Sequence, residues 1–109
     1  MIKASNLDLT PDDLATVITI LEQHLTPMGS VVVSVFGSRA THQAKKYSDL
    51  DLIIEANSGA IPAQVMALLT YDFEESLLPF KVDIVDSAEI TDGFRATISK
   101  DKKTIWQTD

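Results

Sequence analysis

Four residues in the middle of the chain have the types and the spacing that phosphate chemistry requires. Gly37 and Ser38 follow an apolar run rich in β-branched residues, and Asp49 and Asp51 stand at the start of a second such run. Because glycine has no Cβ, main-chain N–H groups beside it can approach an anion closely, and a serine hydroxyl can bind a phosphate oxygen. Arg39 can pair with phosphate or hold the loop that leads to the acids. The combination predicts a site for a nucleotide carried by a metal ion.

Asp49 and Asp51 are two residues apart, so on a strand both carboxylates point to the same face. Carboxylates held this close repel each other, and a divalent cation that binds both removes the repulsion. Mg²⁺ takes oxygen ligands and usually combines one or two protein carboxylates with the phosphates of a substrate. Two unrelated acids at a solvated strand start would give the same pattern, so the pair needs support from a third group.

Asp83 is the candidate for a third carboxylate. Val82 and Ile84 flank it, and if these two side chains enter the core, Asp83 lies on the other face of the sheet. A neighbouring strand could bring it beside Asp49 and Asp51. There it would serve as the general base for an attacking hydroxyl group, or hold a second metal ion.

Helices and strands alternate along the chain and must position these residues. Thr10 caps and Pro11 begins a first helix with an apolar stripe of 3.6-residue spacing, which ends near Gly29. Residue patterns predict strands at 31–36, 50–55, 80–85 and 104–106, and further helices at 61–76 and around 90–98. Asp86 is then expected past the end of a strand, as a cap. Strands separated by helices indicate an α/β or α+β domain with one small sheet.

The size and charge of the chain limit the classes of function. With 109 residues, the chain suits a single domain spanning 1–109. The net charge of −7 would repel a phosphate backbone, which disfavours long nucleic acids and suits a basic protein partner. The chain has no cysteine, no signal-peptide pattern and no apolar run near the about 18 residues that span a bilayer. We therefore expect a cytoplasmic protein without membrane contact.

Three segments resemble the signature of the minimal nucleotidyltransferases of the DNA polymerase beta superfamily: GSRA at 37–40, SDLDL at 48–52 and VDIV at 82–85. The expected order of helices and strands is similar to that family over nearly the whole chain. The resemblance implies the palm-like fold of these enzymes, with a small mixed β-sheet and helices packed on one face. It also implies the antitoxin type, which is paired with a HEPN-domain protein.

The resemblance implies a role for each residue of the signature. Three acids would be both catalytic groups and metal ligands: Asp49, Asp51 and Asp83. Three residues of the glycine turn would bind the nucleotide: Gly37, Ser38 and Arg39. The implied reaction uses Mg²⁺ and transfers a nucleoside monophosphate, expected to be AMP from ATP, to a hydroxyl group of the HEPN-domain partner.

His42 departs from the family pattern, which usually has a glycine two residues after the alanine of the signature. If the backbone needs a positive φ there, His42 must adopt it at some cost in strain. The side chain could instead contact phosphate or a partner, or be a tolerated variant in a loop. The departure bears on activity rather than on fold.

Two classes of function remain open from the sequence. The first is an enzyme that modifies a partner protein. The second is a binding module of the same fold, with weak or absent catalysis, that neutralises a partner toxin by contact. The intact set of three acids favours the enzyme, whereas His42 and the small size leave room for the binding module.

Overall fold

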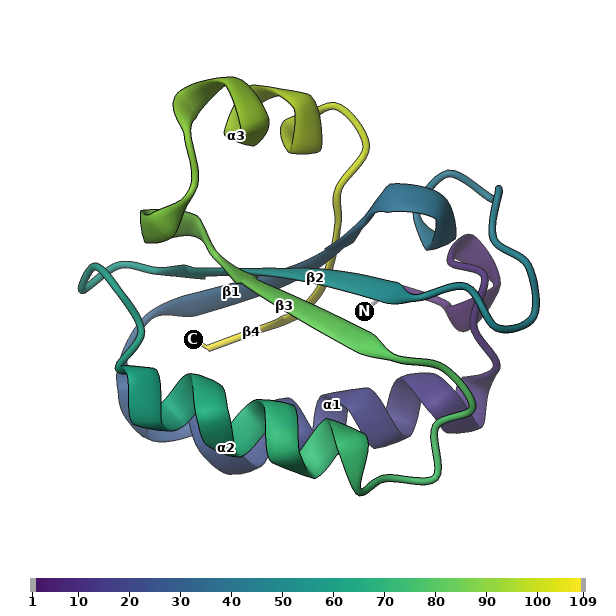
Figure 1. The fold of residues 1–109 in the computed structure, drawn as a ribbon, viewed down its shortest axis with the longest axis horizontal. Helices are drawn as coiled ribbons and strands as arrows, with labels where there is room; N and C mark the ends of the chain where they lie inside the picture. Colours follow the sequence, from purple (N-terminus) through teal and green to yellow (C-terminus); the bar gives the residue numbers. More distant parts are fainter. Residues whose placement is uncertain (1, 109) are drawn as a thin grey trace.

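In the computed structural model, which describes residues 2–108, one four-stranded sheet is combined with three α-helices (Figure 1). The helices and strands follow one another in this order: α1 (Pro11–Leu25), β1 (Val31–Phe36), β2 (Leu50–Ala56), α2 (Ala63–Glu74), β3 (Val82–Asp86), α3 (Asp92–Ser99) and β4 (Lys103–Gln107). None of the helices in this part of the chain is long and apolar enough to cross a membrane.

The sheet is mixed, with strand order β3-β2-β1-β4. β1 lies between β2 and β4 and is antiparallel to both, whereas β2 and β3 are parallel. A parallel pair needs a long crossover, and α2 supplies it. The short edge strand expected near 104–106 is also present, as β4.

The sheet separates the helices into two groups (Figure 1). α1 and α2 run along one face, and the shorter α3 stands on the opposite side. The predicted small mixed sheet is confirmed, and the expectation of helices on one face describes the two long helices. α3 is the exception, and it gives the second face of the sheet a partial cover.

α1 begins and ends close to where the sequence predicts. The side chain of Thr10 accepts a hydrogen bond from the main-chain N–H of Asp13 at 3.1 Å, and Pro11 occupies the first helical position. A capped start of this kind satisfies one of the N–H groups that lack an intrahelical partner. The helix ends at Leu25, and a 3₁₀ turn, Thr26–Met28, leads to Gly29.

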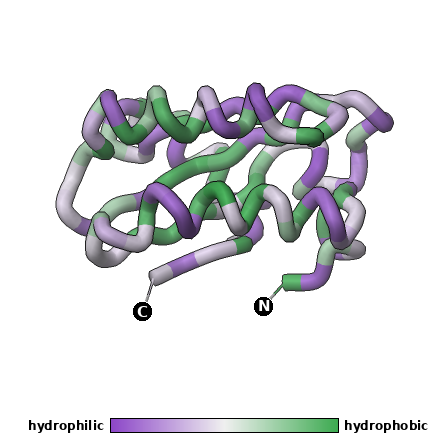
Figure 2. The backbone as a smooth tube through the Cα atoms, turned by 90° about the horizontal axis from the view of Figure 1, so that it is seen from below, coloured by the Kyte–Doolittle hydropathy of each residue, from purple (hydrophilic) through white to green (hydrophobic). Residues whose placement is uncertain are grey.

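The main core lies between the sheet and the two long helices. From β2 it receives Leu50, Leu52 and Ile54, all fully buried. The strand segments that cross the middle of the molecule are accordingly mostly hydrophobic (Figure 2). Ile53 points to the other face, where it is also buried but lies outside this cluster, as does Ile98 of α3. β2 thus has a purely apolar face and a mixed one.

The observed limits of most elements lie within two residues of the prediction, and two differences bear on the site and on the core. β3 covers Val82–Asp86 rather than 80–85, so Asp86 is the last residue of the strand. In α2 the buried positions are Leu69 and Phe73. Leu68, which its spacing from Ile61 and Val65 would also place on the apolar face, is 45% exposed. The periodic pattern identified the helix, but the direction in which α2 packs on α1 decided which apolar residues are buried.

Candidate active site

Gly37 ends β1 and starts a 3₁₀ turn, Gly37–Arg39, with φ at 76°. This φ lies in the left-handed region, which glycine adopts without strain. The space beside Gly37 is also taken, because a Cβ there would lie 2.6 Å from Oδ2 of Asp51. The glycine turn and the second acid of the signature are therefore in direct contact, fourteen positions apart in the sequence.

Asp51 and Asp83 lie side by side on neighbouring strands. They are partners in the parallel register of β2 and β3, so their side chains share a face of the sheet. The neighbours of Asp83 behave as expected: Val82 is buried and Ile84 packs against the core. Asp49 is exposed and lies one residue before β2, so it stands at the same end of this strand as Asp51. We call Asp49, Asp51 and Asp83 the acid cluster.

The surroundings of Asp51 make its charge unfavourable. Its partner in the antiparallel register with β1 is Phe36, whose ring packs edge-to-face on Phe94 of α3 with centroids 6.1 Å apart. Burial raises the pKa of Asp51 above its ordinary value, and the negative charges of Asp83 and Asp49 raise it further. A carboxylate in this position gains from a cation that offsets its neighbours.

The donor set fits a magnesium ion that is held in part by substrate. No group of three His, Cys, Asp or Glu side chains among residues 2–108 has an arrangement that holds a metal ion by itself. Mg²⁺ does not require one, because it is usually bound by one or two carboxylates together with phosphate oxygens. Asp83 also has a cation nearby, since Nζ of the exposed Lys81 lies 3.3 Å from its Oδ1.

Arg39 lies inside the protein rather than beside the acids. Its side chain is 4% exposed, and the guanidinium lies 4.1 Å from the ring centre of Phe80. It donates hydrogen bonds to the carbonyl oxygens of Ser48, Lys46 and Asp8. These contacts match the second of its two expected roles, holding the loop that leads to the acids. Because the guanidinium N–H groups of Arg39 are buried, its other expected role, pairing with a phosphate of the nucleotide, has no support in the structure.

The loop after the turn has a left-handed backbone at His42, the position where the family pattern usually has a glycine. His42 has φ at 58° and is the one residue other than glycine with positive φ in residues 2–108. The positive φ that was expected of His42 if the backbone needs it there is therefore present. Its ring nitrogen Nδ1 lies 2.8 Å from Oδ1 of Asp8, a residue that the sequence analysis had not singled out. Because 34 positions separate the two, no local pattern could have indicated the contact.

Asp86, the other aspartate near the end of β3, is a structural residue. It is 5% exposed, and its two carboxylate oxygens accept hydrogen bonds from the main-chain N–H groups of Ile61 and Ala88. The expected cap is therefore present, at the start of the 3₁₀ turn Ser87–Glu89. Both oxygens are engaged and lie on the core side, so Asp86 is not part of the acid cluster.

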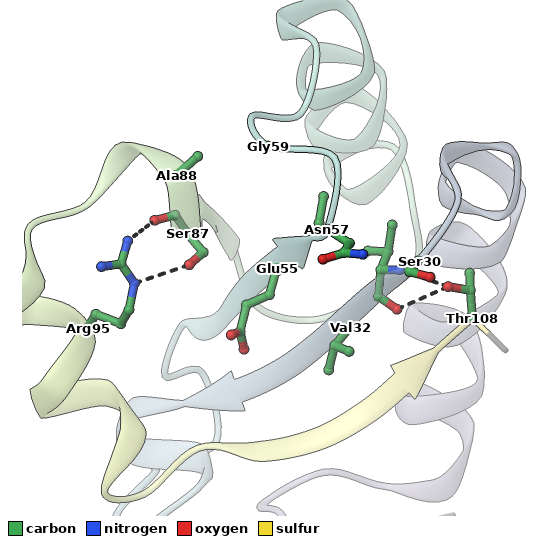
Figure 3. A pocket seen from close by; sticks show the side chains of 11 residues that line it. Ser30, Val32, Glu55, Asn57, Gly59, Ser87, Ala88, Arg95 and Thr108 are labelled. Carbon is green, nitrogen blue, oxygen red and sulfur yellow. Dashed lines mark hydrogen bonds between the residues drawn. The ribbon is translucent and has the colours of Figure 1, made fainter.

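A hollow of about 540 Å³ lies near the other ends of β1 and β2 (Figure 3). Its polar lining includes Glu55, Asn57 and Arg95. The guanidinium of Arg95 donates hydrogen bonds to the hydroxyl and the carbonyl oxygen of Ser87. Lys102 forms an ion pair of 2.8 Å with Glu55. Since Asp51 and Glu55 share one face of β2 at four residues' distance, the hollow lies roughly 13 Å along the strand from the acids.

Sequence comparisons agree with the signature. The family model described as "Polymerase beta, Nucleotidyltransferase" matches residues 16–109. A Haemophilus influenzae protein named probable protein adenylyltransferase MntA is 42% identical over 102 residues, which cover 92% of this chain and 84% of that protein. The protein adenylyltransferase MntA of Thermococcus cleftensis is 26% identical over 94 residues, with 85% and 93% covered.

Solved structures share the fold. One, described as a toxin-antitoxin with AMP-PNP, has a TM-score of 0.71 at 21% identity, with 89% of this chain and 75% of that chain covered. Another contains a tri-AMPylated Shewanella oneidensis HEPN toxin in complex with an MNT antitoxin. Its TM-score is 0.65 at 20% identity, with 88% and 71% covered. At these identities the likeness concerns the arrangement of helices and strands.

Proposed function

From the premise that this chain belongs to the polymerase beta nucleotidyltransferase family, we propose that it is a protein adenylyltransferase. It transfers AMP from ATP to a hydroxyl group of a partner protein and releases pyrophosphate. The names of the two curated relatives support this choice of reaction, because both are protein adenylyltransferases or probable ones.

In this proposal every residue of the signature has a role, and Asp83 has two. Asp49, Asp51 and Asp83 hold Mg²⁺, which when bound neutralises charge on the triphosphate. Main-chain N–H groups at Gly37 and the hydroxyl of Ser38 bind phosphate oxygens. Asp83 accepts the proton of the acceptor hydroxyl as its oxygen forms a bond to the α-phosphorus and the bond to pyrophosphate breaks. Arg39 holds the loop in place and does not touch the nucleotide.

One observation carries the proposal: Asp51 stands between Asp83 and Gly37. It is the register partner of the first, and its carboxylate lies against the second. The raised pKa of Asp51 indicates that this place is unfavourable for a lone negative charge. Proteins keep such costly arrangements at functional sites, where a bound cation or a proton transfer makes use of them.

The partner in this proposal is a HEPN-domain protein, and the transfer makes the present chain an antitoxin. Support comes from the solved structure of an MNT antitoxin with an AMPylated HEPN toxin, which shares this fold. In this proposal a single domain spans 1–109. A cytoplasmic location, where ATP is available, is part of the proposal, as is the absence of long nucleic-acid substrates.

The test is a transfer assay with the chain, its HEPN-domain partner, Mg²⁺ and ATP labelled at the α-phosphate. We expect label on the partner, and loss of that label when Asp49→Asn, Asp51→Asn or Asp83→Asn is introduced. Asp101→Asn is the matched control, since it removes the same charge from an exposed position outside the cluster. Label that persists in the three site variants would contradict the proposed site.

The second candidate is a binding module that neutralises a toxin by contact. The observation in its favour is His42, which stands at φ 58° where the family pattern usually has a glycine. The same assay decides between the two functions. Absence of label, with toxin inhibition retained in Asp49→Asn and Asp51→Asn, would support the binding module and exclude the enzyme.

A further inference from the structure

We propose that Asp8 and His42 form a clamp that holds the loop between β1 and β2 in the shape that binds the triphosphate. Both are positioning residues, because neither is part of the acid cluster or the glycine turn. The inference rests on the proposed function in one respect, namely that the loop binds ATP. It goes beyond the signature, since Asp8 lies outside all of its segments.

Asp8 holds the loop at three residues. Its main-chain N–H donates to the carbonyl oxygen of Arg39 at 3.0 Å, and its own carbonyl accepts from the guanidinium of Arg39. Its carboxylate accepts from the ring of His42 at 2.8 Å through Oδ1 and from the main-chain N–H of Ala44 at 3.1 Å through Oδ2. The N-terminal segment accordingly lies beside this loop in the fold (Figure 1).

The contact with Asp8 accounts for the strained backbone of His42. A histidine at φ 58° is less stable than a glycine there, and the side chain of His42 is 51% exposed, so packing holds it little. The bond to Asp8 offsets that cost. The hydrogen bond with His42 is also the largest cause that lowers the pKa of Asp8, against an opposing effect of burial.

Arg39 extends the clamp to both ends of the site. It follows the phosphate turn directly, and its guanidinium binds the carbonyl oxygens of Asp8 and Ser48. Ser48 precedes Asp49, so one buried side chain links the N-terminal segment, the turn and the start of the acid cluster. A loop of this length without regular structure would otherwise lose conformational entropy when it orders around a nucleotide.

Loss of the clamp should therefore weaken ATP binding more than it slows transfer. We expect Asp8→Asn and His42→Gly each to raise KM for ATP about tenfold, as for one lost hydrogen bond to a charged group, with kcat within about twofold. Their double variant should be no worse than Asp8→Asn alone, because that variant already removes the bond between Asp8 and His42. His42→Gly also removes the backbone strain at position 42. If His42 acted only through its backbone conformation and not through its bond to Asp8, this variant would leave KM for ATP unchanged or lower it.

The molecule contains a matched control for this pair. His24 of α1 and Asp72 of α2 form the same kind of contact, 2.5 Å long, between the two long helices and away from the loop. We expect Asp72→Asn and His24→Gln to leave KM for ATP unchanged. An equal rise in KM in these variants would show that loss of any such pair loosens the whole domain, and would overturn the inference.

Hydrogen exchange separates the clamp from the proposed function. The N–H of Ala44 donates to Asp8, so its exchange should be faster in Asp8→Asn and unchanged in Asp72→Asn, whether or not the protein is active. Unaltered exchange would overturn the clamp. Faster exchange together with unchanged KM would overturn its role in nucleotide binding. A native chain that neither binds nor transfers ATP, but keeps Ala44 protected through Asp8, would overturn the proposed function and leave a structural clamp alone.

Discussion

The two faces of β2 contrast sharply within one strand. Leu50, Leu52 and Ile54 point toward α1 and α2 and are completely buried in the main core. Asp51 and Glu55 point the other way, toward the side where α3 gives only partial cover. Because strand side chains alternate, each residue that stabilises the fold stands next to one that is available for chemistry. The contrast teaches that stability and activity in this domain should be separable by single substitutions one residue apart.

Asp51→Asn should produce the largest effect on activity, and it should separate activity from stability most clearly. We expect transfer activity to fall about 100-fold or more, since a charged group of the site is lost. Stability at pH 7 should rise, because the folded protein holds this carboxylate at a raised pKa and the amide has no charge to bury. Transfer assays and thermal unfolding of the same preparation check both expectations.

The same variant gives a pH signature. A carboxyl whose pKa is raised by folding costs stability when ionised, and this cost vanishes as pH falls through the raised pKa toward the ordinary value near 4. The stability gain of Asp51→Asn should therefore be complete at neutral pH and disappear in acid. A gain that persists below pH 4 would mean that something other than the charge of Asp51 is responsible.

Leu52→Ala is the counterpart on the apolar face. It removes a fully buried side chain from the main core, which should cost about 2–5 kcal/mol of unfolding free energy. Urea denaturation measures the loss. Transfer per folded molecule should be preserved at low temperature, because the acid cluster stands on the opposite face. If the folded molecules of Leu52→Ala lost transfer activity, the claim that the two faces of β2 serve stability and activity separately would be wrong.

Gly37→Ala should have a smaller effect on stability, about 1–2 kcal/mol from the left-handed backbone, but a marked effect on activity. The new Cβ would lie 2.6 Å from Oδ2 of Asp51 and force that carboxylate to move. Gly29→Ala is the matched control: its φ is 84°, and a Cβ there would meet nothing within 4 Å. We expect similar loss of stability in both variants, measured by thermal unfolding, and loss of transfer in Gly37→Ala alone.

The smallest effect should come from the pair at the edge of the site. The hydrogen bond with His42 lowers the pKa of Asp8, so its contribution to stability is present above the ordinary pKa of an aspartate and is lost as pH falls through the lowered value. His42→Gly should therefore make the loss of stability in acid smaller. Near pH 7 the free energy of unfolding should change by no more than about 1 kcal/mol, because backbone strain is relieved as the bond is lost. Unfolding curves from pH 2 to pH 7 measure it.

Most of the elements could be predicted from local patterns. The cap at Thr10, the limits of β1 and the second strand from Leu50 follow from residue types within a few positions. The face occupied by Asp83 also followed, because Val82 and Ile84 are apolar and strand side chains alternate. These features depend on short-range geometry, and local sequence contains it.

Long-range contacts decided the rest of the site. The interior position of Arg39 depends on Phe80 and on the carbonyl of Asp8, and neither can be inferred from the turn that contains the arginine. The exposure of Leu68 depends on how α2 is rotated against α1.

The amino-acid sequence by itself determined the fold class, the glycine turn and the acids that follow it, because periodicity and residue type act over a few positions. Only the tertiary structure decided that Asp51 touches Gly37 and is the register partner of Asp83, and that Asp8 holds His42. Such pairings join residues that are far apart in the chain. Their physical cause is the packing of whole elements against one another, which no single segment contains.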